Sequence, residues 1–513
     1  MILLSKTFSG LIEGINGLII TIEADVSKGL PYFNIIGVAD TSVKESKDRI
    51  RASILNSQLP FPEAKITLNL APASLKKEGS SFDLGSAIAL LASAEFVENQ
   101  NLEKYYFIGE LSLSGEIKPV SGVMPLTLSA LENKFEYAIV PEENKFEAGI
   151  IEGIKVIPVK SLYQTFQFLN GKLNIEPFKV NLSEIATHNY QYDFSEIIGQ
   201  SIAKRGLEIA AAGGHNILMV GPPGTGKTLM AKSFPSILPD MTFEEAFETT
   251  KIHSVAGLTP AGLSLIKQRP FRSPHHTVSS VSLIGGGQNS KPGEVSLAHN
   301  GVLFLDEFPE FKRNCLEALR QPLEDGVVTV SRIKAVYIYP SKFILVAAMN
   351  PCPCGYLNHP EKNCSCSHFT IEKYLSKLSG PLIDRIDIHI EALPVNKREL
   401  LENKKKSKSE SSGVIKKRVQ TARNIQNERF KNSGIYCNGY MNKQQLKKYC
   451  GLTESQNELL VETIEKFNLS ARSYDKILKL SRTIADLGGK ENIEDEHLIE
   501  AVSFRTLDKT KWM

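Results

Sequence analysis

The residues best placed to do chemistry in this chain form a glycine-rich stretch that ends in a lysine and a threonine. Its members are Gly221, Pro222, Pro223, Gly224, Thr225, Gly226, Lys227 and Thr228. An apolar run at 216–220 precedes the stretch and predicts a buried strand, and residues 229–233 predict a helix. In that order, backbone N–H groups converge on phosphates at a helix N-terminus, Lys227 adds positive charge, and the Thr228 hydroxyl is placed for Mg²⁺. We therefore predict a site for ATP and Mg²⁺.

Two further predicted strands end in polar side chains that suit the same chemistry. The apolar run 301–305 leads into Asp306 and Glu307, and the run 343–349 leads into Asn350. Beside a phosphate-binding loop, Asp306 would hold Mg²⁺ through its water shell, whereas Glu307 would orient and polarise the attacking water. The Asn350 amide is placed to position that water, with a cap at the end of the strand as the alternative. These residues predict nucleotide hydrolysis.

Four cysteines form two close pairs directly after Asn350. They are Cys352, Cys354, Cys364 and Cys366. Four thiolates suit tetrahedral Zn²⁺, although one residue separates the members of each pair where zinc knuckles usually have two. Free thiols are the main alternative, and a disulfide is less favoured in a cytosolic chain. We predict a structural zinc whose loss would leave nucleotide binding intact, and we interpret His275 and His276 as packing or hydrogen-bonding residues.

The composition is that of an ordinary soluble protein. Of the 513 residues, 42% are hydrophobic and 23% are charged, and the length predicts about three domains. No stretch reaches the roughly eighteen consecutive apolar residues of a membrane helix, and the N-terminus does not follow the order of a signal peptide. We therefore expect a cytoplasmic protein without a membrane partner. The net charge of +3 is too small to indicate nucleic-acid binding by itself.

The elements that must position these residues predict an α/β chain with several domains. Residues 1–175 alternate short apolar strands with amphipathic stretches, as in an α+β domain, and residues 176–192 read as a linker. Residues 193–392 carry the phosphate-binding loop and the apolar runs of a parallel sheet. A polar linker at 393–413 follows, and its lysines are expected to be solvated rather than bound to nucleic acid. Residues 414–513 are helix-periodic.

Several motifs follow one another along the chain in a recognisable order. They are 198–200, the phosphate-binding loop, Asp306 with Glu307, Asn350, 379–387 and 469–478. In this order the chain resembles AAA+ ATPases of the magnesium-chelatase-like branch, and with 269–277 and the N-terminal domain it resembles the YifB/ComM family over nearly its whole length. The resemblance implies a P-loop parallel sheet with helices on both faces, followed by a C-terminal helical lid. It also implies an arginine finger at Arg385 and a sensor-2 arginine at Arg472.

The resemblance further implies assembly and a polymer substrate. An arginine delivered by a neighbouring subunit would neutralise charge in the transition state and tie hydrolysis to assembly. The alternative for Arg385 is a surface ion pair with the flanking Asp384 or Asp387. By resemblance, we expect a homohexameric ring that moves DNA, with branch migration of recombination intermediates in natural transformation as its activity. Recombination or competence proteins are the expected partners.

A candidate DNA contact lies at 326–339, where alternating residues predict a β-hairpin with Arg332 and Lys334 near its turn. In ring ATPases that this chain resembles, the hairpin at this place projects into the pore. Basic side chains there would give salt-sensitive binding without sequence preference. An ordinary solvent-exposed hairpin is the alternative.

Three segments of the N-terminal domain resemble the Lon proteolytic domain. They are 76–83, 109–115 and 120–125. Ser81 falls at the position of the serine nucleophile, which needs a lysine as its base. The lysine position falls on Met124, which cannot accept a proton, and Phe82 and Asp83 replace small residues. We therefore expect a domain that serves as a scaffold and not as a protease.

Two other functions stay open as alternatives. One is a metal-chelatase-type motor subunit, which the Lon-like domain and the lack of an evident acidic or metal-chelating extension disfavour. The other is an ATP-dependent unfoldase or protease, which Met124 disfavours.

Overall fold

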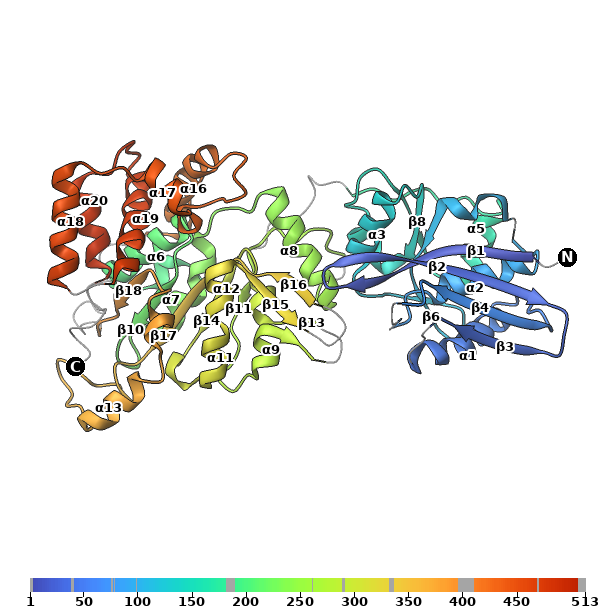
Figure 1. The fold of residues 1–513 in the computed structure, drawn as a ribbon, viewed down its shortest axis with the longest axis horizontal. Coiled ribbons are helices and arrows are strands. Elements are labelled where there is room, and N and C mark those ends of the chain that lie inside the picture. Colours follow the sequence, from blue (N-terminus) through green and yellow to red (C-terminus); the bar gives the residue numbers. More distant parts are fainter. Residues whose placement is uncertain are drawn as a thin grey trace. The chain divides into compact units, whose positions relative to one another are not determined.

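The computed structural model describes residues 3–37, 41–74, 77, 79–97, 99–180, 190–260, 262–287, 291–331, 336–394, 410–467 and 470–505. The chain divides into two compact units (Figure 1). The first unit comprises Met1–Ala186 with Ala246–Ile266, and the second comprises Thr187–Glu245 with Lys267–Met513. The segment Ala246–Ile266 therefore clusters with the first unit, whereas the sequence analysis placed it inside the core at 193–392.

The first unit is built on a seven-stranded sheet in the order β3-β4-β2-β1-β5-β8-β9, of which β1 to β4 can be followed in Figure 1. Its strands are β1 (Leu3–Glu13), β2 (Asn16–Ser27), β3 (Tyr32–Ile36), β4 (Lys65–Ala71), β5 (Tyr105–Phe107), β8 (Tyr137–Pro141) and β9 (Lys155–Val159). Strand β2 pairs antiparallel with β1 and β4, whereas the other neighbours in the sheet are parallel. A small sheet pairs β6 (Glu110–Leu111) with β7 (Ile117–Lys118), and the helices are α1 (Thr41–Asn56), α2 (Asp83–Ser93), α3 (Val123–Glu132), α4 (Lys145–Ala148) and α5 (Leu162–Leu169).

Helix α2 is the buried centre of this unit. All its residues are buried, because its apolar side chains pack against β1 and β2. Burial raises the pKa of Asp83 at the start of the helix, and Arg49 of α1 pairs with that carboxylate at 2.9 Å. The segment Ala246–Ile266 is fastened in the same unit by the N–H of Gly122, which donates to the Ser254 carbonyl at 2.9 Å.

The second unit is built on a five-stranded parallel sheet in the order β11-β14-β17-β10-β18 (Figure 1). Its strands are β10 (Ile217–Val220), β11 (Phe271–Arg272), β14 (Val302–Leu305), β17 (Ile344–Met349) and β18 (Ile388–Glu391). The helices of this unit that precede the C-terminal region are α6 (Ser201–Gly213), α7 (Lys227–Ser233), α9 (Ser280–Ile284), α10 (Glu294–Leu297), α11 (Arg313–Ala318), α12 (Arg320–Asp325), α13 (His368–Leu375) and α14 (Gly380–Ile383). Helix α8 (Phe243–Ala256) begins in this unit and belongs to the first unit from Ala246 onwards. Every residue of β10, β14 and β17 is buried, as in parallel strands that are covered on both faces. The predicted α/β class is confirmed.

Five helices complete the second unit at its C-terminal end. They are α16 (Ser412–Arg429), α17 (Lys443–Tyr449), α18 (Glu454–Lys466), α19 (Ala471–Leu487) and α20 (Asp495–Ser503). Helices α16 and α19 pack on α6 and share a hydrophobic core with the sheet. In α19 the buried residues Ile477, Leu480 and Ile484 recur at helical spacing. The predicted C-terminal helical region is confirmed.

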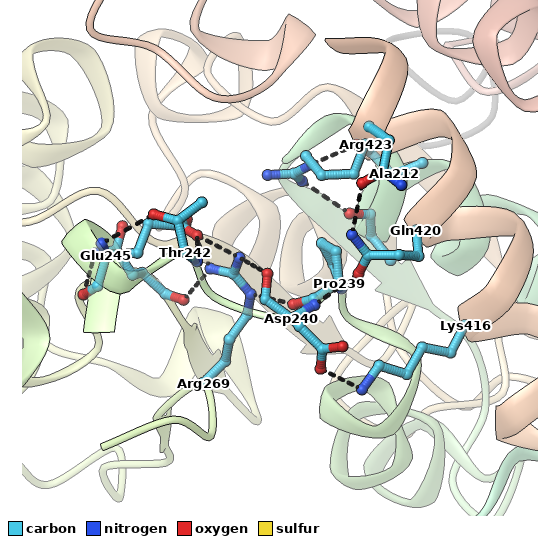
Figure 2. A network of polar contacts seen from close by, with 12 residues as sticks. Ala212, Pro239, Asp240, Thr242, Glu245, Arg269, Lys416, Gln420 and Arg423 are labelled. Carbon is cyan, nitrogen blue, oxygen red and sulfur yellow. Dashed lines mark hydrogen bonds and ion pairs between the residues drawn. The ribbon is translucent and has the colours of Figure 1, made fainter. Parts of the chain in front are cut away.

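A network of polar contacts surrounds the buried guanidinium of Arg269 (Figure 2). Two of its nitrogens donate to the two carboxylate oxygens of Glu245 at 3.0 Å each, and a third donates to the Pro239 carbonyl at 2.7 Å. Burial by itself raises the pKa of Glu245, but Arg269 outweighs burial and lowers that pKa. Both members of the bidentate pair therefore stay ionised although they are buried.

The same network reaches helix α16 (Figure 2). Lys416 pairs with the Asp240 carboxylate at 2.6 Å, and Arg423 donates to the carbonyls of Ala211 and Ala212 at 3.1 and 3.3 Å. Those carbonyls belong to the last turn of α6, where the helix dipole favours a cation. The contacts brace α16 against α6 and the loop before α8.

Two predicted features lie partly or wholly outside the described residues. Strands β15 (Val327–Ser331) and β16 (Val336–Pro340) form the predicted antiparallel hairpin, but Arg332 and Lys334 lie outside the described part of the chain. Of the linkers, residues 181–189 and 395–409 lie outside it as well.

Strands β12 (Gly285–Gly286) and β13 (Lys291–Pro292) form a second small ribbon. No helix within the described residues is long and apolar enough to cross a membrane.

A buried charge cluster joins α19 to the sheet through Asp387, which directly precedes β18. Its carboxylate lies 2.8 Å from the Lys476 ammonium and 3.6 Å from His215 Nδ1. Burial by itself raises the pKa of Asp387, but Lys476 and then His215 outweigh burial and hold that pKa well below its usual range. A lowered carboxyl pKa stabilises the fold above the unfolded pKa of about 3.9, and this stabilisation is lost as the pH falls.

We predict that Asp387→Ala lowers the free energy of unfolding by about 3–5 kcal/mol at pH 7, because Lys476 then stays buried without its partner. The double variant Asp387→Ala with Lys476→Met should recover most of this loss. It should also lose less stability than the wild type when the pH is lowered from about 5 to about 2. Denaturant unfolding at several pH values measures both effects, and a single variant as stable as the wild type at pH 7 would contradict the role of the cluster.

Candidate nucleotide-binding site

The phosphate-binding loop lies between β10 and α7. Gly224 and Gly226 have φ angles of 83° and 85°, a left-handed conformation that costs little only for glycine. A Cβ added at either residue would meet nothing within 4 Å, so glycine is needed there for the backbone and not for space. The Thr225 hydroxyl closes the turn by donating to the Pro222 carbonyl at 3.0 Å. The open space above the loop suits phosphate groups at the N-terminus of α7.

The Lys227 ammonium lies under this loop among neutral acceptors. It donates to the carbonyls of Gly221 and Pro222 at 2.6 and 2.9 Å, and the Asn350 amide oxygen lies 3.3 Å away. Desolvation lowers the pKa of Lys227 to about 8, although the Asp306 carboxylate acts in the opposite direction. Anionic phosphate oxygens would be stronger partners for this cation than carbonyls.

Oxygen ligands for a divalent cation meet beside the lysine. The Thr228 hydroxyl donates to one carboxylate oxygen of Asp306 at 2.8 Å, and the N–H of Glu307 donates to the other at 3.0 Å. A hydroxyl and a carboxylate side by side are the hard ligands that Mg²⁺ prefers, so these residues fit the ion. The structure therefore brings together Lys227, Thr228, Asp306 and Asn350, as the sequence predicts for the ATP site.

A histidine contacts the predicted catalytic carboxylate. His276 Nδ1 lies 3.1 Å from Glu307 Oε2, and Glu307 itself has an uncommon left-handed φ of 53°. The sequence predicts a packing or hydrogen-bonding role for His276 but no partner. The partner follows from β11, which pairs with β14 and so brings the residues after it to the edge where Glu307 lies. A strand of two residues gives almost no signal in a sequence.

The four predicted zinc ligands converge in the loop after β17. The Sγ atoms of Cys352, Cys354 and Cys364 lie 3.4–3.6 Å apart, and with Cys366 all four lie within 4.8 Å of one another. Zinc–sulfur bonds of about 2.3 Å in a tetrahedron place sulfurs about 3.8 Å apart, so the thiols fit Zn²⁺. Although desolvation acts the other way, the backbone N–H groups of Tyr356 and Ser365 lower the pKa of Cys354.

The two predicted arginines lie away from the phosphate-binding loop of their own subunit. Arg385 precedes β18, and its carbonyl accepts from the side chain of Asn216, which precedes β10, at 3.2 Å. Both residues are therefore at the amino edge of the parallel sheet, whereas the phosphate-binding loop is at the carboxyl edge. Arg472 begins α19 near the same edge, since Arg505 joins the neighbouring Ser473 to the Ile386 carbonyl.

The side chain of Arg385 is paired within its own chain. It donates to the Pro381 carbonyl at 2.7 Å and to the carboxylate of Glu324 in α12. Arg385 first, and Arg472 at longer range, lower the pKa of Glu324. An ion pair was the alternative that the sequence left open, but its partner is Glu324 and not the flanking Asp384 or Asp387.

The serine that falls at the Lon nucleophile position is bonded to backbone. The Ser81 hydroxyl donates to the Gly10 carbonyl at 3.0 Å. Met124 is fully buried at the start of α3, where its N–H donates to Glu147 at 2.9 Å. A thioether at this position supplies no base, so the non-proteolytic interpretation stays the prediction for this unit.

Comparison with known proteins covers nearly the whole chain. The family described as "Magnesium chelatase, subunit ChlI" matches residues 193–400, and its companions "Subunit ChlI of Mg-chelatase" and "Magnesium chelatase, subunit ChlI C-terminal" match residues 22–144 and 409–505. The chain is 42% identical to the uncharacterized protein YifB of Escherichia coli, over 97% of this chain and 96% of that protein. It is 41% identical to the competence protein ComM of Haemophilus influenzae, over 98% of each. The magnesium-chelatase 67 kDa subunit of Chlorobaculum parvum is 25% identical over 31% of this chain and 23% of that subunit. The chain therefore belongs to the YifB/ComM family of magnesium-chelatase-like AAA+ proteins.

Proposed function

We propose that this chain is an ATP-hydrolysing motor that assembles as a homohexameric ring and drives branch migration of DNA recombination intermediates in the cytoplasm. The observation that carries the proposal is the place of Arg385 and Arg472, at the edge of the sheet opposite to the phosphate-binding loop. From that edge they would complete the nucleotide site of a neighbouring subunit. The relative named competence protein supports natural transformation as the setting, with recombination or competence proteins as partners.

In this proposal the residues at the carboxyl edge of the sheet bind and hydrolyse ATP. Lys227 and the N–H groups of 221–226 would bind the phosphates. Thr228 and Asp306 would hold Mg²⁺, which supplies positive charge to the phosphates when it is bound. Glu307 would accept a proton from the attacking water, and the Asn350 amide would orient that water.

His276 would position Glu307 for this step. We predict that His276→Ala lowers kcat for ATP about tenfold and leaves KM within about twofold, because the imidazole contacts Glu307, whose proposed role is in hydrolysis and not in binding the phosphates. His275→Ala is the matched control, since that ring stacks on His276 but bonds to Thr277. Steady-state ATPase assays measure both variants. A higher kcat for His276→Ala would mean that the histidine restrains Glu307 instead of orienting it.

Mixing two inactive variants tests whether Arg385 acts on the nucleotide site of a neighbouring subunit or on that of its own subunit. Arg385→Ala and Lys227→Ala should each abolish most ATPase activity. In mixed rings, a subunit with an intact phosphate-binding loop can meet a neighbour with an intact arginine at about a quarter of the interfaces. We therefore predict that mixing the two inactive proteins restores part of the activity. No recovery in rings shown by sedimentation to contain both subunits would place the action of Arg385 within its own subunit.

DNA is proposed to bind at the β15–β16 hairpin, through Arg332 and Lys334. Removing two phosphate contacts reduces the slope of log affinity against log salt by about 1.8 on duplex DNA. We predict that Arg332→Ala with Lys334→Ala keeps the basal ATPase activity but loses stimulation by DNA and the unwinding of three- and four-stranded junctions. Lys466→Ala with Lys490→Ala, at exposed positions among the C-terminal helices, removes the same charge and should change none of these.

The junction assay also separates the alternatives. A wild-type protein that hydrolyses ATP but neither binds nor unwinds branched DNA would overturn the DNA motor. It would favour the alternative of a chelatase-type motor subunit, and the partial similarity of this chain to a magnesium-chelatase 67 kDa subunit supports that alternative. The first unit is proposed to serve as a scaffold, because Met124 replaces the base that a Lon-type protease requires.

We also propose that Cys352, Cys354, Cys364 and Cys366 hold one structural Zn²⁺. The support is their convergence within 4.8 Å, at separations close to those around tetrahedral zinc. When bound, Zn²⁺ would crosslink a loop that has no strand or helix of its own. Metal analysis of protein purified without chelators should find about one zinc per chain.

A further inference from the structure

We propose that the cysteine loop, residues 350–367, controls the nucleotide site: with Zn²⁺ bound it supports the phosphate-binding loop, and without the metal nucleotide binding weakens. This inference rests on the proposed ATP and zinc sites. It departs from the expectation drawn from the sequence, in which the two sites are separate because they lie on different strands. The departure rests on three observations that relate the cysteine loop to the residues that would bind ATP.

The first contact joins a cysteine turn to the phosphate-binding loop. The N–H of Gly355 donates to the Cys352 carbonyl at 3.0 Å, which closes a turn that contains the first two zinc ligands. A Cβ added at Gly355 would lie 2.6 Å from Pro223 Cδ, and the φ angle of Gly355 is 84°. The backbone of this turn therefore packs directly on Pro223, in a conformation that favours glycine. A shift of the turn removes a support of the phosphate-binding loop.

The second observation is a pocket that the two loops line together, at the start of the phosphate-binding loop. On one side it is lined by Gly221 and Pro222, and on the other by Leu357, Asn358 and Pro360 of the cysteine loop. These three residues lie between the two cysteine pairs. Their position depends on both pairs being held together, which is what four bonds to one ion would achieve.

The third contact runs through the sensor amide. Asn350 stands two residues before Cys352, and its amide oxygen lies 3.3 Å from the Lys227 ammonium. A Cβ added at Gly355 would also lie 3.8 Å from the Asn350 side chain, so the cysteine turn backs that amide. The turn that contains Cys352 and Cys354, the Asn350 amide and the Lys227 ammonium thus form one contiguous set of contacts.

The cysteine loop has no regular secondary structure to fix its conformation. Between the end of β17 at Met349 and the start of α13 at His368, the chain forms neither helix nor strand. A loop of this length without secondary structure is uncommon in a compact domain unless something organises it. If loss of zinc leaves the packed arrangement populated about one-tenth of the time, the apparent Kd for nucleotide rises about tenfold.

The test uses the full chain, a fluorescent ATP analogue with excess Mg²⁺, and metal analysis of every sample. Cys364→Ser with Cys366→Ser removes the cysteine pair outside the turn that packs on Pro223 and leaves the residues of that turn unchanged. It should lose zinc and bind the analogue about tenfold more weakly. Ser365→Ala, between the same cysteines, keeps four thiols and should keep both zinc and affinity.

Wild-type protein provides the second arm, which needs no variant to fold. Zinc is removed with a chelator, the chelator is dialysed away, and one equivalent of Zn²⁺ is returned. Affinity for the analogue should fall about tenfold on removal and recover on return. Zinc-free protein that keeps its circular dichroism and binds the analogue as tightly as zinc-loaded protein overturns this inference alone.

The other outcomes are distinct. Protein that takes up no zinc, even when Zn²⁺ is added, overturns the zinc site and this inference but leaves the ATP site standing. Zinc-loaded wild type that fails to bind the analogue overturns the proposed ATPase itself.

Discussion

The parallel direction of one five-stranded sheet is the constraint on which the rest of the second unit depends. Because β10, β14 and β17 all run the same way, the residues that follow them meet at one edge. Those residues are the phosphate-binding loop, the acidic pair and Asn350. The same rule sends Arg385, which precedes β18, to the opposite edge. One geometric fact thus assembles a nucleotide site and separates it from the arginines, which is the arrangement that a ring would use.

Two of the charged groups in the second unit that are buried or mostly buried are paired with an opposite charge. Arg269 is paired with Glu245 on both carboxylate oxygens, and Asp387 is paired with Lys476 of α19. Such pairs add little net stability compared with apolar packing, but breaking one leaves an uncompensated charge inside the protein. The pair of Asp387 with Lys476 therefore fixes the position of α19 more firmly than it strengthens the fold, and the position of α16 is fixed by Lys416 and Arg423. Nucleotide-driven movement of these helices would have to keep the pairs or exchange their partners.

The contacts around the catalytic carboxylates extend the site beyond its sequence motifs. His276 reaches Glu307 from β11, an edge strand of the sheet, and Glu324 holds Arg385 from α12, next to the β15–β16 hairpin. The cysteine loop backs Pro223 and Asn350 from the other side. The predicted catalytic carboxylate, the predicted arginine finger and the phosphate-binding loop each have a contact that the sequence motifs do not indicate.

The sequence by itself determined the features whose causes are local. Gly224 and Gly226 are required by the φ angles of one turn. An apolar run followed by Asp306 and Glu307 predicts a buried strand and the position where that strand ends. The four cysteines were equally visible, because two close pairs have few uses in a chain of this kind. The hairpin was found as well, since alternation and turn residues are adjacent in the chain.

Only the tertiary structure decided which distant residues meet. The partners of Glu307 and Arg385, the contact of Gly355 with Pro223, and the grouping of Ala246–Ile266 with the first unit all depend on strand order and packing. Glu324 and Arg385 are 61 positions apart, and no local preference of either residue specifies the other. Backbone conformation follows from neighbours in the chain, whereas side-chain pairing follows from neighbours in space, which only the folded sheet defines.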